Sequence, residues 1–78
     1  MINTSQIREH MEVVGSDGGH VGKVDKLMGS DIELAKLDFG SGLKHHLIPV
    51  TWVESIEDDK VCLNMTRDAA KLAWREKH

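Results

Sequence analysis

Histidine is the residue type in this 78-residue chain that offers the most chemistry, because imidazole is the commonest metal ligand in proteins. The chain contains none of the HxH, HxxxH or CxxC spacings that bring two ligands to one ion within a single element. Neighbouring residues on a strand point to opposite faces, so two adjacent histidines on an unbroken strand cannot share a metal. The five histidines are His10, His20, His45, His46 and His78.

A metal site would need His45 or His46 together with His20 and a carboxylate such as Asp17 or Asp25. We therefore name His20 and His46 as the candidate ligands. Surface or packing roles account for these histidines more simply, because most protein histidines bind no metal. The sequence predicts no metal and no cofactor.

The nucleophilic side chains give no sign of an active site. Cys62 lies between Val61 and Leu63 in an apolar alternation, which is typical of a buried thiol rather than a reactive thiolate. No serine lies in a G-x-S-x-G turn. The sequence predicts that the protein is not an enzyme.

The charge balance also excludes some partners. The 13 acidic residues outnumber the 10 basic ones, giving a formal charge of −3, whereas nucleic-acid-binding domains usually carry a basic excess. The chain has no apolar run of membrane-spanning length and no apolar segment near its start. A single cysteine cannot form an intramolecular disulfide, so we expect a reducing, cytoplasmic location without membrane contact.

Glycine-rich turns and valine-rich runs predict a mainly β domain. The runs are separated by Gly15–Gly19, Gly29–Asp31, Gly40–Gly42 and a polar turn at 57–60. A short helical turn is expected before them, at 3–10. The predicted strands are 12–14, 20–28, 32–39, 45–50 and 61–65. The segment 51–56 is either a further strand or the continuation of the strand 45–50 after a kink.

Two of these strands carry apolar residues on both faces. In the strand 20–28, Gly22 permits a bulge that resets which face points inward. The strand 32–39 must either bend or have its second face covered. Bends of this kind let a short sheet close into a barrel.

The segment 66–78 predicts a terminal helix. Thr66 is a good N-cap and Asp68 a favourable first-turn acid, while Ala70, Ala73 and Trp74 form one stripe. About 13 residues seldom form a stable helix alone in water. We therefore expect Leu72 and Trp74 to dock on the sheet or on a partner, with Trp74 either a core anchor or an interface anchor.

Three segments resemble the PRC-barrel-like proteins, and in particular an uncharacterised bacterial subset. They are Met11-Glu12-Val13-Val14-Gly15-Ser16-Asp17-Gly18, then His20-Val21-Gly22-Lys23-Val24-Asp25-Lys26, then His45-His46-Leu47-Ile48-Pro49 followed by Trp52-Val53. The resemblance implies a small, strongly bent antiparallel β-barrel, with Gly22 at a bend and Ile48-Pro49-Val50 closing it. The chain then forms a single domain over 1–78, with the barrel in 1–65 and the helix in 66–78.

The resemblance implies a docking role, because PRC-type barrels generally serve as docking or assembly modules. We therefore expect a cytoplasmic, non-enzymatic adaptor that binds an unidentified protein partner, with a homodimer as one form of such contact. Two alternatives stay open. One is a ribosome- or RNA-associated accessory domain, suggested by a related barrel in a ribosome maturation factor, and the other is a small-ligand or metal sensor that uses His20 and His46.

Overall fold

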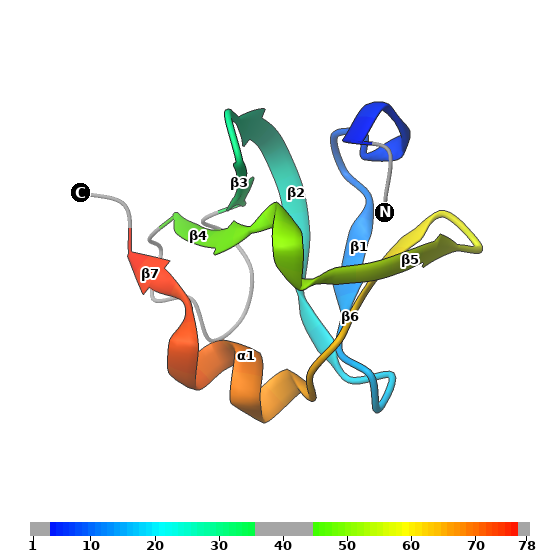
Figure 1. The fold of residues 1–78 in the computed structure, drawn as a ribbon, viewed down its shortest axis with the longest axis vertical. Helices are drawn as coiled ribbons and strands as arrows, with labels where there is room; N and C mark the ends of the chain where they lie inside the picture. Colours follow the sequence, from blue (N-terminus) through cyan, green and yellow to red (C-terminus); the bar gives the residue numbers. More distant parts are fainter. Residues whose placement is uncertain (1–3, 36–44, 77–78) are drawn as a thin grey trace.

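A computed structural model describes residues 4–35 and 45–76, and Figure 1 shows its fold. Half of the predicted strand 32–39 and the turn Gly40–Gly42 lie outside these residues. No helix in the described part is long and apolar enough to cross a membrane. The elements in chain order are η1 (Thr4–Gln6), β1 (Glu12–Val14), β2 (His20–Met28), β3 (Asp31–Leu34), β4 (His46–Pro49), η2 (Val50–Trp52), β5 (Val53–Glu57), β6 (Lys60–Leu63), α1 (Arg67–Ala73) and β7 (Arg75–Glu76).

The seven strands of the described residues form one sheet in the order β5-β6-β1-β2-β3-β4-β7. Every neighbouring pair is antiparallel except β1 and β6, which are parallel. The prediction of an entirely antiparallel sheet was therefore wrong. The physical reason is η2, which kinks the chain between β4 and β5 without reversing it, so β6 returns in the direction of β1 (Figure 1).

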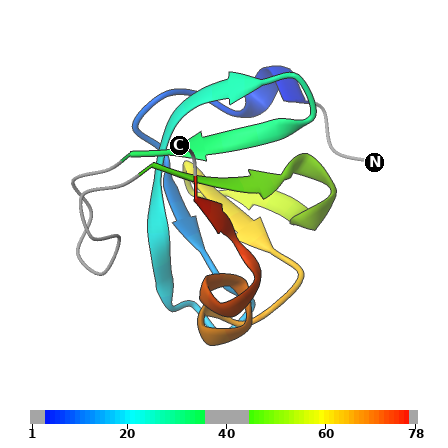
Figure 2. The ribbon, with the colours of Figure 1, turned by 90° about the vertical axis from the view of Figure 1, so that its left-hand side faces the viewer.

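The sheet is mainly β and strongly curved, as Figure 2 shows, but it is not closed into a barrel. Its two end strands, β5 and β7, do not pair with each other in the part of the chain that the structure describes. The predicted closure was wrong because β7, at the carboxyl side of α1, continues the sheet beyond β4 instead of reaching β5. Both ends of the sheet are left as edges.

Two bulges bend β2. The pairing partners Val13–Gly22 and Val14–His20 leave Val21 as an extra residue, and Val24–Leu34 and Lys26–Glu33 leave Asp25 as another. As a result Val21 and Val24, which have opposite parity, are both buried. The predicted change of facing is confirmed, although the bulges lie at Val21 and Asp25 while Gly22 itself is paired.

The core contains apolar side chains from most elements. Both faces of β3 are covered, because Ile32, Glu33 and Leu34 are consecutive and all buried. Trp52 and Trp74 are half-buried and pack against the core. The core residues are Ile7, Met11, Val13, Val21, Val24, Ile32, Leu34, Ile48, Val53, Val61, Leu63 and Ala70.

Helix α1 begins as predicted and ends earlier than predicted. The Thr66 hydroxyl accepts a hydrogen bond from the Ala69 N–H at 3.3 Å, which confirms the N-cap. The expected helix 66–78 stops at Ala73, and Trp74 takes an extended conformation before β7 pairs with β4. Pairing with the sheet and stacking of Trp74 on His46 outweigh about one and a half more turns of exposed helix.

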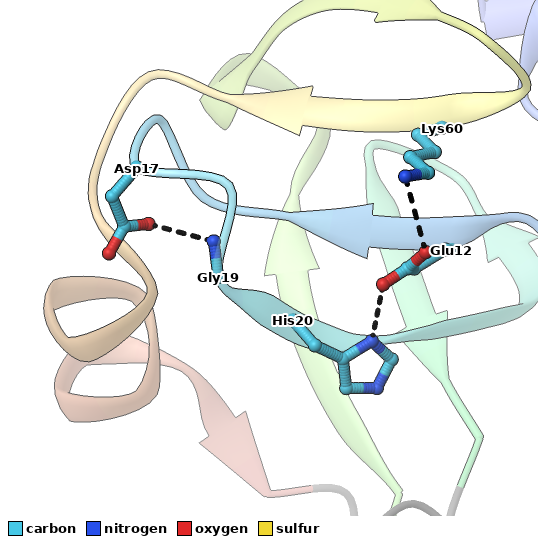
Figure 3. Close-up of polar contacts among 5 residues, drawn as sticks. All are labelled: Glu12, Asp17, Gly19, His20 and Lys60. Atoms are coloured by element: carbon cyan, nitrogen blue, oxygen red, sulfur yellow. Dashed lines mark hydrogen bonds and ion pairs between the residues drawn. The ribbon is translucent and has the colours of Figure 1, made fainter.

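The turn between β1 and β2 clamps the start of α1 (Figure 3). The carboxylate of Asp17 accepts hydrogen bonds from the N–H of Gly19 at 3.1 Å and from the N–H of Arg67 at 3.2 Å. The Ser16 N–H donates to the Met65 carbonyl at 2.8 Å. Asp17 therefore caps a helix that lies far from it in the sequence.

Gly15 lets this turn approach the helix closely. A Cβ at Gly15 would collide with the backbone N of Arg67 and lie 2.8 Å from the Thr66 carbonyl carbon.

We predict that Gly15→Ala lowers the free energy of unfolding by about 1–3 kcal/mol, as overpacking generally does. Urea unfolding followed by Trp fluorescence measures this free energy of unfolding. Ser16→Ala, in the same exposed turn, should change it by less than about 0.5 kcal/mol; equal losses would contradict the packing argument.

The clamp also predicts a dependence on pH. Hydrogen bonds from the Gly19 N–H and then the Arg67 N–H hold the pKa of Asp17 below its ordinary value of 3.8. The resulting stabilisation is present above pH 3.8 and is lost as the pH falls through the lower pKa of the folded state. We expect Asp17→Ala to lower Tm at pH 7 and the difference from the natural protein to shrink below pH 3.8. Glu54→Gln, which alters an exposed carboxylate on β5, is the control. A difference that stays constant with pH would contradict the clamp.

Candidate functional site

His20 belongs to a row of ionisable groups across three neighbouring strands (Figure 3). Its Nδ1 lies 2.9 Å from Oε2 of Glu12 on β1, and Oε1 of Glu12 lies 3.9 Å from Nζ of Lys60 on β6. All three side chains are between one third and one half exposed. Exposed pairs of this kind contribute about 0–1 kcal/mol, so the row stabilises pairing of β2, β1 and β6 modestly.

His46 lies in a different environment. It is 4% exposed, and its ring stacks on Trp74 with 3.9 Å between ring centroids and 17° between planes. Nζ of Lys71 lies 5.7 Å from the Trp74 ring. His20 and His46 thus have separate partners, and the structure does not bring the two candidate ligands together.

His45 is the histidine that meets carboxylates. Its Nδ1 lies 3.6 Å from Oε2 of Glu33 and 3.8 Å from Oδ2 of Asp25, and it is hydrogen-bonded to the Leu34 carbonyl oxygen at 2.9 Å. One donor atom from each of Asp25, Glu33 and His45 lies within 4.8 Å of the others. Among the described residues, Asp25, Glu33 and His45 form the group whose side chains are of the kinds that bind metals and lie close enough together to share an ion.

Sequence reasoning found part of this cluster. It named His45 and Asp25 as members of alternative ligand sets, and it missed Glu33. The signal for Glu33 was present, because a carboxylate stands between Ile32 and Leu34 in an otherwise apolar strand. Asp17, the other carboxylate considered, holds the start of α1 instead.

Cys62 is half-buried, with its Sγ 3.9 Å from the Lys60 carbonyl oxygen. It lines a surface depression with residues of the β1–β2 turn, β5 and β6, and a second depression lies between η1 and Ile56. In the described part of the chain neither depression is lined by a histidine. The thiol therefore has no imidazole beside it in that depression to act as a base.

Leu72 lies on the outer side of α1 and is 89% exposed. Ala69 and Ala73, three residues before it and one after, are also exposed. The predicted stripe of Ala70, Ala73 and Trp74 is thus confirmed for Ala70 and Trp74 and was wrong for Ala73. Leu72 does not dock on the sheet.

Comparison with models of known protein families shows which family the chain belongs to. The model of a family described as "Uncharacterized protein conserved in bacteria (DUF2171)" matches residues 7–71. The chain belongs to this family. The DUF2171 match includes the clamp and the cluster of Asp25, Glu33 and His45, and it ends one residue before Leu72. A search of curated proteins found no match.

The geometry separates the roles of the two candidate interaction residues. Trp74 packs on the core, so we predict that Trp74→Ala lowers the free energy of unfolding by about 2–3 kcal/mol, less than a fully buried tryptophan would. Leu72→Ala should change it by less than about 0.5 kcal/mol, because the side chain is in solvent. Chemical denaturation followed by circular dichroism tests both. A large loss in Leu72→Ala would show that this side chain packs in solution.

Proposed function

We propose that this protein is a non-enzymatic docking module of the bacterial cytoplasm that binds a partner protein through the outer face of α1. The observation that carries the proposal is the 89% exposure of Leu72 on a helix whose other side is fixed to the sheet. The exposed Ala69 and Ala73 extend the apolar face on one side of it. In helix-in-groove recognition, a helix places its exposed apolar side chains in a hydrophobic groove of the partner protein, and Leu72 is such a side chain.

The helix is held rigidly for this role. Its start is fixed by Thr66 and Asp17, Ala70 is fully buried beneath it, and Trp74 anchors its end. The side chain of Arg75 donates a hydrogen bond to Asp31 at 2.7 Å, which fastens β7 beyond the helix. A rigid presenting element loses little conformational entropy on binding.

The charges around Leu72 favour a partner with an acidic rim. The same helix carries Arg67, Asp68 and Lys71, and Asp68 lies 3.9 Å from Arg67. Since Asp68 offsets one of the two basic charges, the helix keeps one net positive charge beside Leu72, in a chain whose formal charge is −3. The apolar face of one leucine and two alanines is much smaller than the about 800 Å² per partner of stable complexes. It is therefore too small to hold two copies together, and it suits a groove that encloses the helix.

Kinship with the PRC-barrel-like proteins forms part of the proposal. It is supported by the sharply bent sheet, with bulges in β2, and by the position of His46-Leu47-Ile48-Pro49 as a strand that is paired on both sides. A docking role is what that kinship implies. The cytoplasmic location rests on the single cysteine.

Site-specific crosslinking in the living bacterium tests the proposal. A photoreactive amino acid at position 72 should give a discrete adduct with one protein, while the same group at position 54 on β5 should not. The captured protein, once purified, should bind the natural chain and bind Leu72→Asp about 10- to 100-fold more weakly, since a buried leucine contributes about 1.5–3 kcal/mol. Leu72→Asp should keep the natural Tm.

Other outcomes would overturn this function. An adduct of twice the chain's mass would indicate self-association, and an adduct with RNA would support the accessory-domain alternative. No adduct at position 72, or binding that Leu72→Asp leaves unchanged, would exclude the helix face as the docking surface.

A further inference from the structure

We propose that Asp25, Glu33 and His45 form a binding site for a divalent transition-metal ion. The site lies where β2, β3 and the residue before β4 meet, away from the exposed face of α1. Glu33 is 2% exposed, and the other two side chains are partly buried. The argument uses the backbone that places these groups, the distances between them and their chemistry.

The bulge in β2 places Asp25 in the cluster. Val24 pairs with Leu34 and Lys26 with Glu33, so Asp25 is the extra residue opposite the junction of Glu33 and Leu34. Leu34 pairs in turn with His46, which sets His45 beside the same end of β3. A bulge in β2, the strand β3 and the residue before β4 therefore fix the three side chains.

The distances suit a shared ion. Nδ1 of His45 lies 3.6 Å from Oε2 of Glu33 and 3.8 Å from Oδ2 of Asp25. Ligands bound to an ion at about 2.0–2.2 Å lie roughly 3–3.6 Å from one another. The two separations from His45 are at or close to that range, and the ligand atoms of Asp25 and Glu33, which lie within 4.8 Å of each other, need to approach by at most about 1–2 Å. The Leu34 carbonyl oxygen, 2.9 Å from the same Nδ1, is a fourth potential donor.

The donor set selects the class of metal. Imidazole suits zinc, iron, copper and nickel ions, whereas carboxylate and carbonyl oxygens suit manganese, magnesium and calcium. Two carboxylates with one imidazole favour ions that accept both, namely Zn²⁺ and Mn²⁺. Magnesium and calcium bind mainly through oxygen and gain little from His45.

An ion would also relieve a local cost. Two carboxylates converge on one imidazole, and one of them is almost completely removed from water. Like charges repel one another at short range, and more strongly where water is excluded. A divalent ion neutralises both carboxylates, at the expense of the hydrogen bond between His45 and Leu34.

Calorimetric titration of the full chain with Zn²⁺ and with Mn²⁺ tests the site. We expect saturable binding of one ion per chain, weakened at least about tenfold by Asp25→Asn and by His45→Gln. Glu33→Gln is a further variant, but its buried position can impair folding. His20→Gln, which alters the imidazole beside Glu12, is the matched control and should keep the natural affinity.

Paramagnetic broadening by Mn²⁺ locates the ion independently of affinity. Amide signals of residues 24–26, 33–35 and 45–46 should disappear first in the nuclear magnetic resonance spectrum. The absence of Zn²⁺ and Mn²⁺ binding would overturn the proposal. So would binding that Asp25→Asn and His45→Gln leave intact, loss of binding in His20→Gln, or a response to magnesium and calcium alone.

Discussion

The carboxylate of Asp17 joins two distant parts of this chain, and much of the structure depends on that junction. A helix of seven residues has too few internal hydrogen bonds to persist in water. Asp17 supplies an acceptor to its first turn, and the turn carrying Asp17 has a glycine where the helix comes closest. At the other end of the helix Trp74 stacks on His46, and β7 pairs with the edge of β4.

The sequence predicted the local structure well where one physical signal dominated. The bounds of the strands 12–14 and 20–28 agree with β1 and β2, and Thr66 caps α1, because glycine turns and a capping hydroxyl act over a few residues. The parallel pairing of β1 with β6 and the early end of α1 were not predicted. Both depend on partners far away in the chain, which local patterns do not encode.

The candidate site shows the same limit. The residue types predicted a histidine close to a carboxylate, and His45 does lie close to Asp25. The two histidines that were named as ligands have other partners, because His20 contacts Glu12 and His46 stacks on Trp74. Only the bulge in β2 determines that Asp25 faces His45 rather than the opposite side of the sheet. Bulge positions shift by a residue without changing the apolar pattern. Glu33 was missed because its apolar neighbours made it look like part of the core strand.

The central position of β1 has a consequence for how the protein is made. This strand can pair with β2 as soon as both have been synthesised, yet its other neighbour, β6, comes much later in the chain. The edge of β1 therefore stays open until β6 has been made, and contacts between such distant segments form slowly. The sheet cannot be completed before then, so the nascent chain is most exposed to aggregation along that edge.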